Sequence, residues 1–134
     1  MIADTGVLYA SMDADDPSHP ACVALLSAVP DPIRIPAPVV VELDWLGHSR
    51  STRALDVTLE AIEAGSLDVV ALTDEDYPRI RQLCLRYADL PLGFVDASVV
   101  AVCERLGETT VATLDRRHFS VVRPRHTGSF TLVP

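Results

Sequence analysis

The chain has 134 residues, of which 49% are hydrophobic, and its formal net charge is −8 at pH 7. A domain of this length buries roughly two thirds of its unfolded surface, so we expect one domain over residues 1–134. The uninterrupted apolar runs are far shorter than the roughly 20 residues of a membrane-spanning helix. The first residues also lack the basic and apolar segments of a signal peptide. We therefore expect a cytoplasmic protein that does not enter the membrane.

The charges are unevenly distributed. Five acidic residues and no basic residue precede Arg34, whereas residues 116–126 contain four arginines and no acid. The overall charge argues against a nucleic-acid partner, because phosphate binding usually requires a basic surface, but the arginine-rich stretch provides a local basic edge. All eleven basic residues are arginines, so chemistry that requires a lysine is excluded.

Hydrophobic spacing divides the chain into short strands and longer helices. Apolar residues recur every three or four positions in the helical segments, Pro17 suits a first turn, and Gly65 suits a helix end. Strands alternate with helices, which predicts an α/β fold in three α/β/α layers around a mostly parallel sheet of about five short strands. In chain order the predicted elements are a strand at 1–3, helices at 5–12 and 17–29, a strand at 33–36, helices at 37–49 and 52–65, a strand at 66–73, helices at 74–88 and 90–107, and strands at 109–115 and 129–134.

Four acidic residues interrupt the apolar patterns. Asp4 and Asp115 follow predicted strands, at the end where open α/β sheets bind ligands. Glu42 and Asp96 lie on mainly apolar helix faces, where an unpaired carboxylate is costly to bury. Taken singly, Asp4 could be a helix cap, Asp96 a partner of the helix dipole and Asp115 a turn residue. Glu42 has no comparable structural explanation, and together the four indicate a shared site.

If the four carboxylates converge, their repulsion must be offset. Without lysine the candidates are arginine, shared protons or metal cations, and clustered carboxylates suit Mg²⁺ or Mn²⁺. Such a site points to phosphoryl chemistry. Haloacid-dehalogenase-type phosphotransferases and phospho-receiver domains also place acids at strand ends, but both rely on a lysine. The first class would also have an Asp at the position of Gly6, and the glycine-rich loops that bind phosphates are absent.

Four segments together resemble the PIN-domain proteins, and specifically the VapC-type ribonuclease toxins of bacterial toxin–antitoxin pairs. The resemblance spans the whole chain. It lies in "IADTGVL" with Asp4, "PVVVELDWL" with Glu42, "LPLGFVDASVVAVCERLG" with Asp96, and "VATLDRRHF" with Asp115. It implies a PIN-like nuclease domain and an Mg²⁺-dependent, or Mn²⁺-dependent, endoribonuclease that hydrolyses RNA with a metal-activated water.

The resemblance also assigns roles to residues. Asp4, Glu42, Asp96 and Asp115 would form the catalytic acidic pocket, with metal ligands among Asp4, Asp96 and Asp115, and Thr5 and Thr113 would orient the carboxylates. Arg116 and Arg117 would meet the RNA backbone, although they could equally form a solvated turn. Relatives often carry a further Asp or Asn just after the fourth acid, and its absence here leaves a second metal position unsupported. The implied partners are a VapB-type antitoxin and a second copy of the chain. The alternative function is a non-catalytic module of the same fold that binds a metal or a partner.

Overall fold

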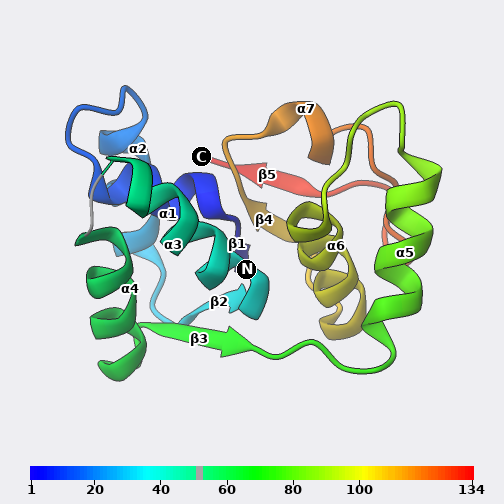
Figure 1. Ribbon diagram of the computed structural model, residues 1–134, viewed down its shortest axis with the longest axis horizontal. Coiled ribbons are helices and arrows are strands. Elements are labelled where there is room, and N and C mark those ends of the chain that lie inside the picture. The colour runs from blue at the N-terminus through cyan, green and yellow to red at the C-terminus, as the bar shows by residue number, and fades with distance from the viewer. Residues whose placement is uncertain (51–52) are drawn as a thin grey trace.

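In the computed structural model, which describes residues 1–50 and 53–134, short strands form one sheet in the order β3-β2-β1-β4-β5 (Figure 1). Every pair of neighbouring strands is parallel. The predicted α/β fold with a parallel sheet is therefore confirmed, and the last strand lies at the edge of the sheet. The strands are β1 (Ile2–Ala3), β2 (Ile33–Pro36), β3 (Leu67–Val70), β4 (Thr110–Ala112) and β5 (Thr131–Val133).

The helices fall into two groups because the strand order reverses at β1. The chain first moves outward from β1 to β3 and then returns to place β4 on the other side of β1. Right-handed crossovers then put α1–α4 on one face of the sheet and α5 and α6 on the other, and Figure 1 shows these two groups on the left and right. The helices are α1 (Thr5–Met12), α2 (His19–Ala28), α3 (Ala37–Arg50), α4 (Arg53–Glu63), α5 (Asp76–Arg86), α6 (Phe94–Leu106) and α7 (Arg116–Phe119).

The central strand and α6 form the middle of the core. Both residues of β1 are fully buried, because β1 has a strand on either side and helices above and below. Residues 97–103 of α6 are also buried, and this helix ends at Gly107 in the left-handed conformation (φ 69°) that glycine adopts without strain. The ends of β1 and α6 that carry acidic residues are therefore fixed by the best-packed part of the molecule.

Element boundaries differ from the sequence-based prediction at several points. The second helix begins at His19 and not near Pro17, because the preceding residues form a turn around Asp16, whose side chain accepts the amide of Ser18. The sixth helix begins at Phe94, after turns in which the carbonyl of Tyr87 accepts two amides. The short helix α7 was not predicted, and the predicted start of a helix at residue 52 lies outside the described residues. No helix in the described ranges is long and apolar enough to cross a membrane.

Candidate active site

Neighbouring strands bring two of the four acids to one edge of the sheet. β1 and β4 pair with Ala3 opposite Ala112, and the amide of Asp4 extends this ladder by donating to the carbonyl of Ala112 at 2.9 Å. Asp4 thus lies directly beyond β1, and Asp115 lies just beyond β4, immediately before α7. Both acids occupy the edge at which open parallel sheets bind ligands.

The other two acids reach the same edge from helices. Glu42 lies in the second turn of α3, which begins directly after β2, and Asp96 lies in the first turn of α6. Together with Asp4 and Asp115 they line one open pocket of about 640 Å³. The structure therefore brings together all four carboxylates that the sequence singled out, although residues 4 and 115 are far apart in the chain.

Asp4 is the most deeply buried of the four, with 6% of its surface exposed. Its Oδ1 atom accepts the amide of Thr5 at 2.7 Å, and its Oδ2 atom accepts the hydroxyl of Thr113 at 2.8 Å. Burial raises the pKa of Asp4 to about 6, the hydrogen bond from Thr113 opposes this rise, and the negative charges of Asp96 and Glu42 add to it. The carboxyl group thus carries a desolvation cost that a nearby positive charge would offset.

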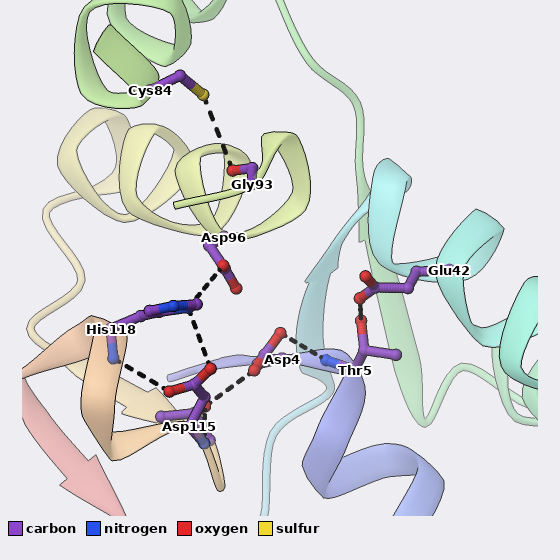
Figure 2. Close-up of polar contacts among 9 residues, drawn as sticks. Asp4, Thr5, Glu42, Cys84, Gly93, Asp96, Asp115 and His118 are labelled. Atoms are coloured by element: carbon purple, nitrogen blue, oxygen red, sulfur yellow. Dashed lines mark hydrogen bonds and ion pairs between the residues drawn. The ribbon is translucent and has the colours of Figure 1, made fainter. Parts of the chain in front are cut away.

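Thr5 connects Asp4 to Glu42. Its amide donates to Asp4, and its hydroxyl donates to the Oε2 atom of Glu42 at 2.5 Å (Figure 2). Because Thr5 is itself buried, it holds the two carboxylates at a fixed separation. Thr5 and Thr113 therefore make the contacts expected of residues that orient the acids.

A histidine connects the remaining two acids. The Nδ1 atom of His118 lies 2.9 Å from Oδ2 of Asp96 and 3.0 Å from Oδ2 of Asp115, and the ring stands between the two carboxylates in Figure 2. The other oxygen of Asp115, Oδ1, accepts the backbone amide of His118 at 3.0 Å. Burial raises the pKa of Asp96, and the charge interaction and hydrogen bond with His118 act against that rise.

Helix capping, helix-dipole and turn roles, the structural explanations considered for the single acids, hold in part. Asp4 and Asp115 do cap the helices that follow them, since each side chain accepts a backbone amide of α1 or α7. Asp96 is different, because the N-cap of α6 is Gly93, which has no side chain to cap the helix, and the Asp96 carboxylate interacts both with the backbone of Gly93 and with His118. Its carboxylate is directed at His118 (Figure 2). Capping alone therefore does not account for Asp96.

The two arginines after Asp115 both line the pocket. Arg116 donates a hydrogen bond to the carbonyl oxygen of Pro134, which ties it to the end of the last strand. Within residues 1–50 and 53–134, the guanidinium of Arg117 has no hydrogen-bond or ion-pair partner. Arg117 is thus an exposed positive charge at the mouth of an acidic pocket.

The pocket suits a divalent cation by the chemistry of its donors. Carboxylate oxygens are the ligands that Mg²⁺ and Mn²⁺ favour, and the raised pKa of Asp4 marks a carboxyl group that lacks a compensating positive charge. In the present side-chain arrangement, no three His, Cys, Asp or Glu residues of the described ranges could hold one metal ion. Oxygens of Asp4, Asp96 and Asp115 are engaged by Thr5, Thr113 and His118, so some of them must turn before they can bind a metal.

Comparison with known proteins identifies the family of the chain. Residues 1–123 match the model of the PIN domain. The chain belongs to the PIN-domain family. Ribonuclease VapC26 of Mycobacterium tuberculosis is 33% identical to this PIN domain over 135 residues, which cover 100% of both chains. The family that the sequence motifs resemble is therefore confirmed.

A solved structure shows the same PIN fold. The crystal structure of VapC20 from Mycobacterium tuberculosis, a toxin that cleaves the sarcin–ricin loop, matches with a TM-score of 0.80. The match covers 99% of this chain and 98% of that chain at 21% sequence identity. At this identity the similarity is one of fold, and it extends over nearly the whole PIN domain.

His118 was not predicted as a member of the site. Arginine, shared protons and metal cations were the groups expected to offset the four carboxylates, and histidine was not among them. The spacing of Asp115 and His118 could have indicated this. The side chain of an Asp N-cap accepts the backbone amide of the second or third residue that follows it, and His118 is the third residue after Asp115. The contact with Asp96 depends on the packing of α6 against the sheet and could not be read from spacing.

Proposed function

We propose that this chain is a divalent-metal-dependent endoribonuclease and the toxin of a type II toxin–antitoxin pair. The observation that carries the proposal is the convergence of Asp4, Glu42, Asp96 and Asp115 on one pocket of a PIN domain. The relative from Mycobacterium tuberculosis that aligns along its entire length is named a ribonuclease. A module that only binds a partner protein would have no need for four carboxylates gathered in one pocket, two of which are held by the buried Thr5.

In this proposal Asp4 and Asp96 would hold Mg²⁺, or Mn²⁺, and Asp115 would bind it directly or through water. When bound, the cation would lower the pKa of a water ligand and neutralise charge on the phosphodiester. Glu42 completes the pocket and orients or deprotonates the attacking water. Thr5 and Thr113 fix the directions of the Asp4 and Glu42 carboxylates through the hydrogen bonds described above.

Arg117, together with Arg116, supplies the positive charge that an RNA substrate requires. An acidic pocket on a protein of net charge −8 repels the phosphate backbone, so a contact at the pocket mouth has to overcome this repulsion. The guanidinium of Arg117 is available for such a contact within the described structure. Arg116 is held by the carbonyl of Pro134 and presents a more fixed charge. We place the protein in the cytoplasm, where its RNA substrate is found.

The proposed partners are a VapB-type antitoxin and a second copy of the chain. An apolar groove next to the acidic pocket includes side chains that are unusually exposed, with 72% of Trp45 and 70% of Val41 accessible. Tyr77 and Phe94 line the same groove and are about half exposed. Contiguous exposed apolar surface of this kind marks an interaction site, and we assign it to the homodimer.

The test is RNA cleavage by the purified chain with and without a chelator. Cleavage should require added Mg²⁺ or Mn²⁺, stop with EDTA and resume when metal is restored. Sequencing the new 5′ ends after induced expression in a bacterium identifies the RNA that is cut. Cleavage that persists in EDTA at full rate would refute metal dependence, and the absence of cleavage of any RNA under all conditions would favour the non-catalytic module.

A further inference from the structure

One nitrogen atom of His118 contacts both Asp96 and Asp115. The distances from Nδ1 to the two Oδ2 atoms, 2.9 and 3.0 Å, are nearly equal. Because carboxylate oxygens accept hydrogen bonds, Nδ1 carries the ring proton, and that single N–H is shared between the two acceptors. The ring therefore stands between the carboxylates, and a cation that bridged them would need the same space.

Neither carboxylate depends on this ring for its position. Asp115 accepts the backbone amide of His118 through its other oxygen, and its own amide donates to the hydroxyl of Thr113 at 2.9 Å. Asp96 belongs to the rigid, buried helix α6, and the backbone of Gly93 stabilises its charged form. Removing the ring nitrogen would thus free one oxygen of each acid and leave both side chains near their present places.

We propose that the His118 ring competes with a divalent cation for Asp96 and Asp115 and thereby sets the metal affinity of the acidic pocket. This inference rests on the proposed function, because it takes the two acids to be metal-binding residues. A cation binds carboxylate oxygen at about 2.1 Å, closer than the ring nitrogen now lies, so the two cannot occupy the space between the acids together. Without a cation, the ring N–H offsets part of the repulsion between the carboxylates.

Loss of the His118 ring changes metal affinity in one direction if the ring competes with the cation and in the opposite direction if the ring only supports the metal ligands. A histidine that only orients ligands forms a hydrogen bond with a carboxylate on the side away from the metal, and its loss weakens metal binding. A competing ring opposes metal binding, and its loss strengthens it. Damage to the fold also weakens binding, so a gain in affinity cannot arise from a merely structural defect.

The decisive experiment measures Mn²⁺ affinity of the EDTA-treated, then dialysed, protein by calorimetry. His118→Phe has neither a donor nor a metal ligand, so no hydrogen bond to Asp96 or Asp115 holds its ring between the carboxylates, and the ring can turn out of the space that the cation needs. We expect the variant to bind Mn²⁺ about tenfold more tightly, the factor that corresponds to one hydrogen bond to a charged group. His48→Phe is the matched control, because His48 is exposed, lies outside the acidic pocket and pairs with Asp44 on its own helix. The Mn²⁺ affinity of this variant should equal that of the wild type. An unchanged or weaker affinity in a folded His118→Phe protein overturns the proposal.

A second measurement uses the unmodified chain. In a protein labelled with ¹⁵N-histidine, saturating Mg²⁺ should shift the His118 ring nitrogens and accelerate exchange of the Nδ1 proton with water, because the ring leaves the two carboxylates. Ring signals that do not respond to Mg²⁺ binding overturn the proposal even if His118→Phe fails to fold. If wild-type protein cleaves RNA with metal but affinity does not rise in His118→Phe, this inference fails and the proposed function stands. Tighter Mn²⁺ binding in His118→Phe, with no RNA cut by either protein, would support the competition and refute the proposed function.

Discussion

Thr113 and Asp4 are joined by a buried hydrogen bond of 2.8 Å across 109 positions of the chain. The same hydroxyl accepts the amide of Asp115 at 2.9 Å. One small side chain at the end of β4 therefore holds the acids that follow two neighbouring strands. This contact explains why a hydroxyl residue, and not merely a small one, suits this position.

Thr113→Val should destabilise the protein although it preserves the shape of the side chain. The change leaves an oxygen of Asp4 and the amide of Asp115 without their partner, and an unsatisfied buried group costs about 1–3 kcal/mol. Urea unfolding at neutral pH measures the loss. Thr110→Val is the control, because Thr110 is half-buried on β4 and its side chain does not contact the acids. Its free energy of unfolding should differ from that of wild type by a few tenths of a kcal/mol, about the scale of an ordinary surface change. Equal stability of the two variants would show that the Thr113 hydroxyl contributes little.

Asp4 should make the metal-free protein less stable at neutral pH than at mildly acidic pH. Its pKa is raised to about 6 in the folded chain, so the folded state binds this proton more tightly than the unfolded state, whose Asp pKa is about 3.9. The resulting stabilisation is complete below about pH 4 and is lost as the pH rises through 6, with a total of about 3 kcal/mol.

Comparison with Asp4→Asn isolates this effect from all other titrating groups. In EDTA, the variant should be more stable than wild type at pH 7.5, and the difference should shrink between pH 7 and pH 5. Urea unfolding at several pH values provides the measurement. A stability difference that does not change with pH over this range contradicts the raised pKa of Asp4.

Asp96→Asn should abolish RNA cleavage while the protein remains folded. The substitution keeps the size of the side chain but removes a charged group of the proposed metal site, and loss of one such transition-state contact commonly costs on the order of 10² to 10³ in rate. Single-turnover cleavage with several metal concentrations measures this loss. Asp44→Asn, an acid on α3 outside the pocket, should cleave like wild type. Wild-type cleavage by Asp96→Asn would refute the assignment of the pocket.

Arg117→Ala should weaken RNA binding more at low salt than at high salt. Loss of one phosphate contact to single-stranded RNA reduces the slope of log K against log salt by about 0.7. Binding is measured by fluorescence anisotropy in the Asp96→Asn background, so that the RNA stays intact. Arg81→Ala, an exposed arginine on α5 away from the pocket, controls for the change in net charge. If both variants alter the slope equally, Arg117 acts only through its general charge.

Trp45→Glu should convert the proposed homodimer into a monomer. The exposed indole, which lines an apolar groove, would be replaced by a charged group, and an unpaired charge is costly to bury. Sedimentation analysis over a range of concentrations reports the oligomeric state. Leu85→Glu changes a residue that is 63% exposed on α5 outside this groove and should leave the dimer intact. A wild-type chain that is monomeric at high concentration would contradict the assignment.

The sequence predicted the location of the acids better than their environment. Asp4 and Asp115 follow strands, and the carboxyl ends of adjacent parallel strands meet at one edge, so their convergence was predictable from the element order. The role of His118 was not, because α7 is a single turn with no periodicity and is positioned by the burial of Phe119. Burial is the largest cause of the raised pKa values of both Asp4 and Asp96, ahead of repulsion between the acids. Burial depends on packing of the whole chain and has no local signature.

The strand order also determines when the pocket can form during synthesis. Asp4 and Glu42 leave the ribosome early, but Asp115 follows β4, which must insert beside β1 to complete the sheet. Asp96 and its partner His118 likewise belong to the last third of the chain. A nascent polypeptide of this sequence therefore carries no complete set of acids until β4 and α7 have been made, and the acidic pocket cannot close before that point.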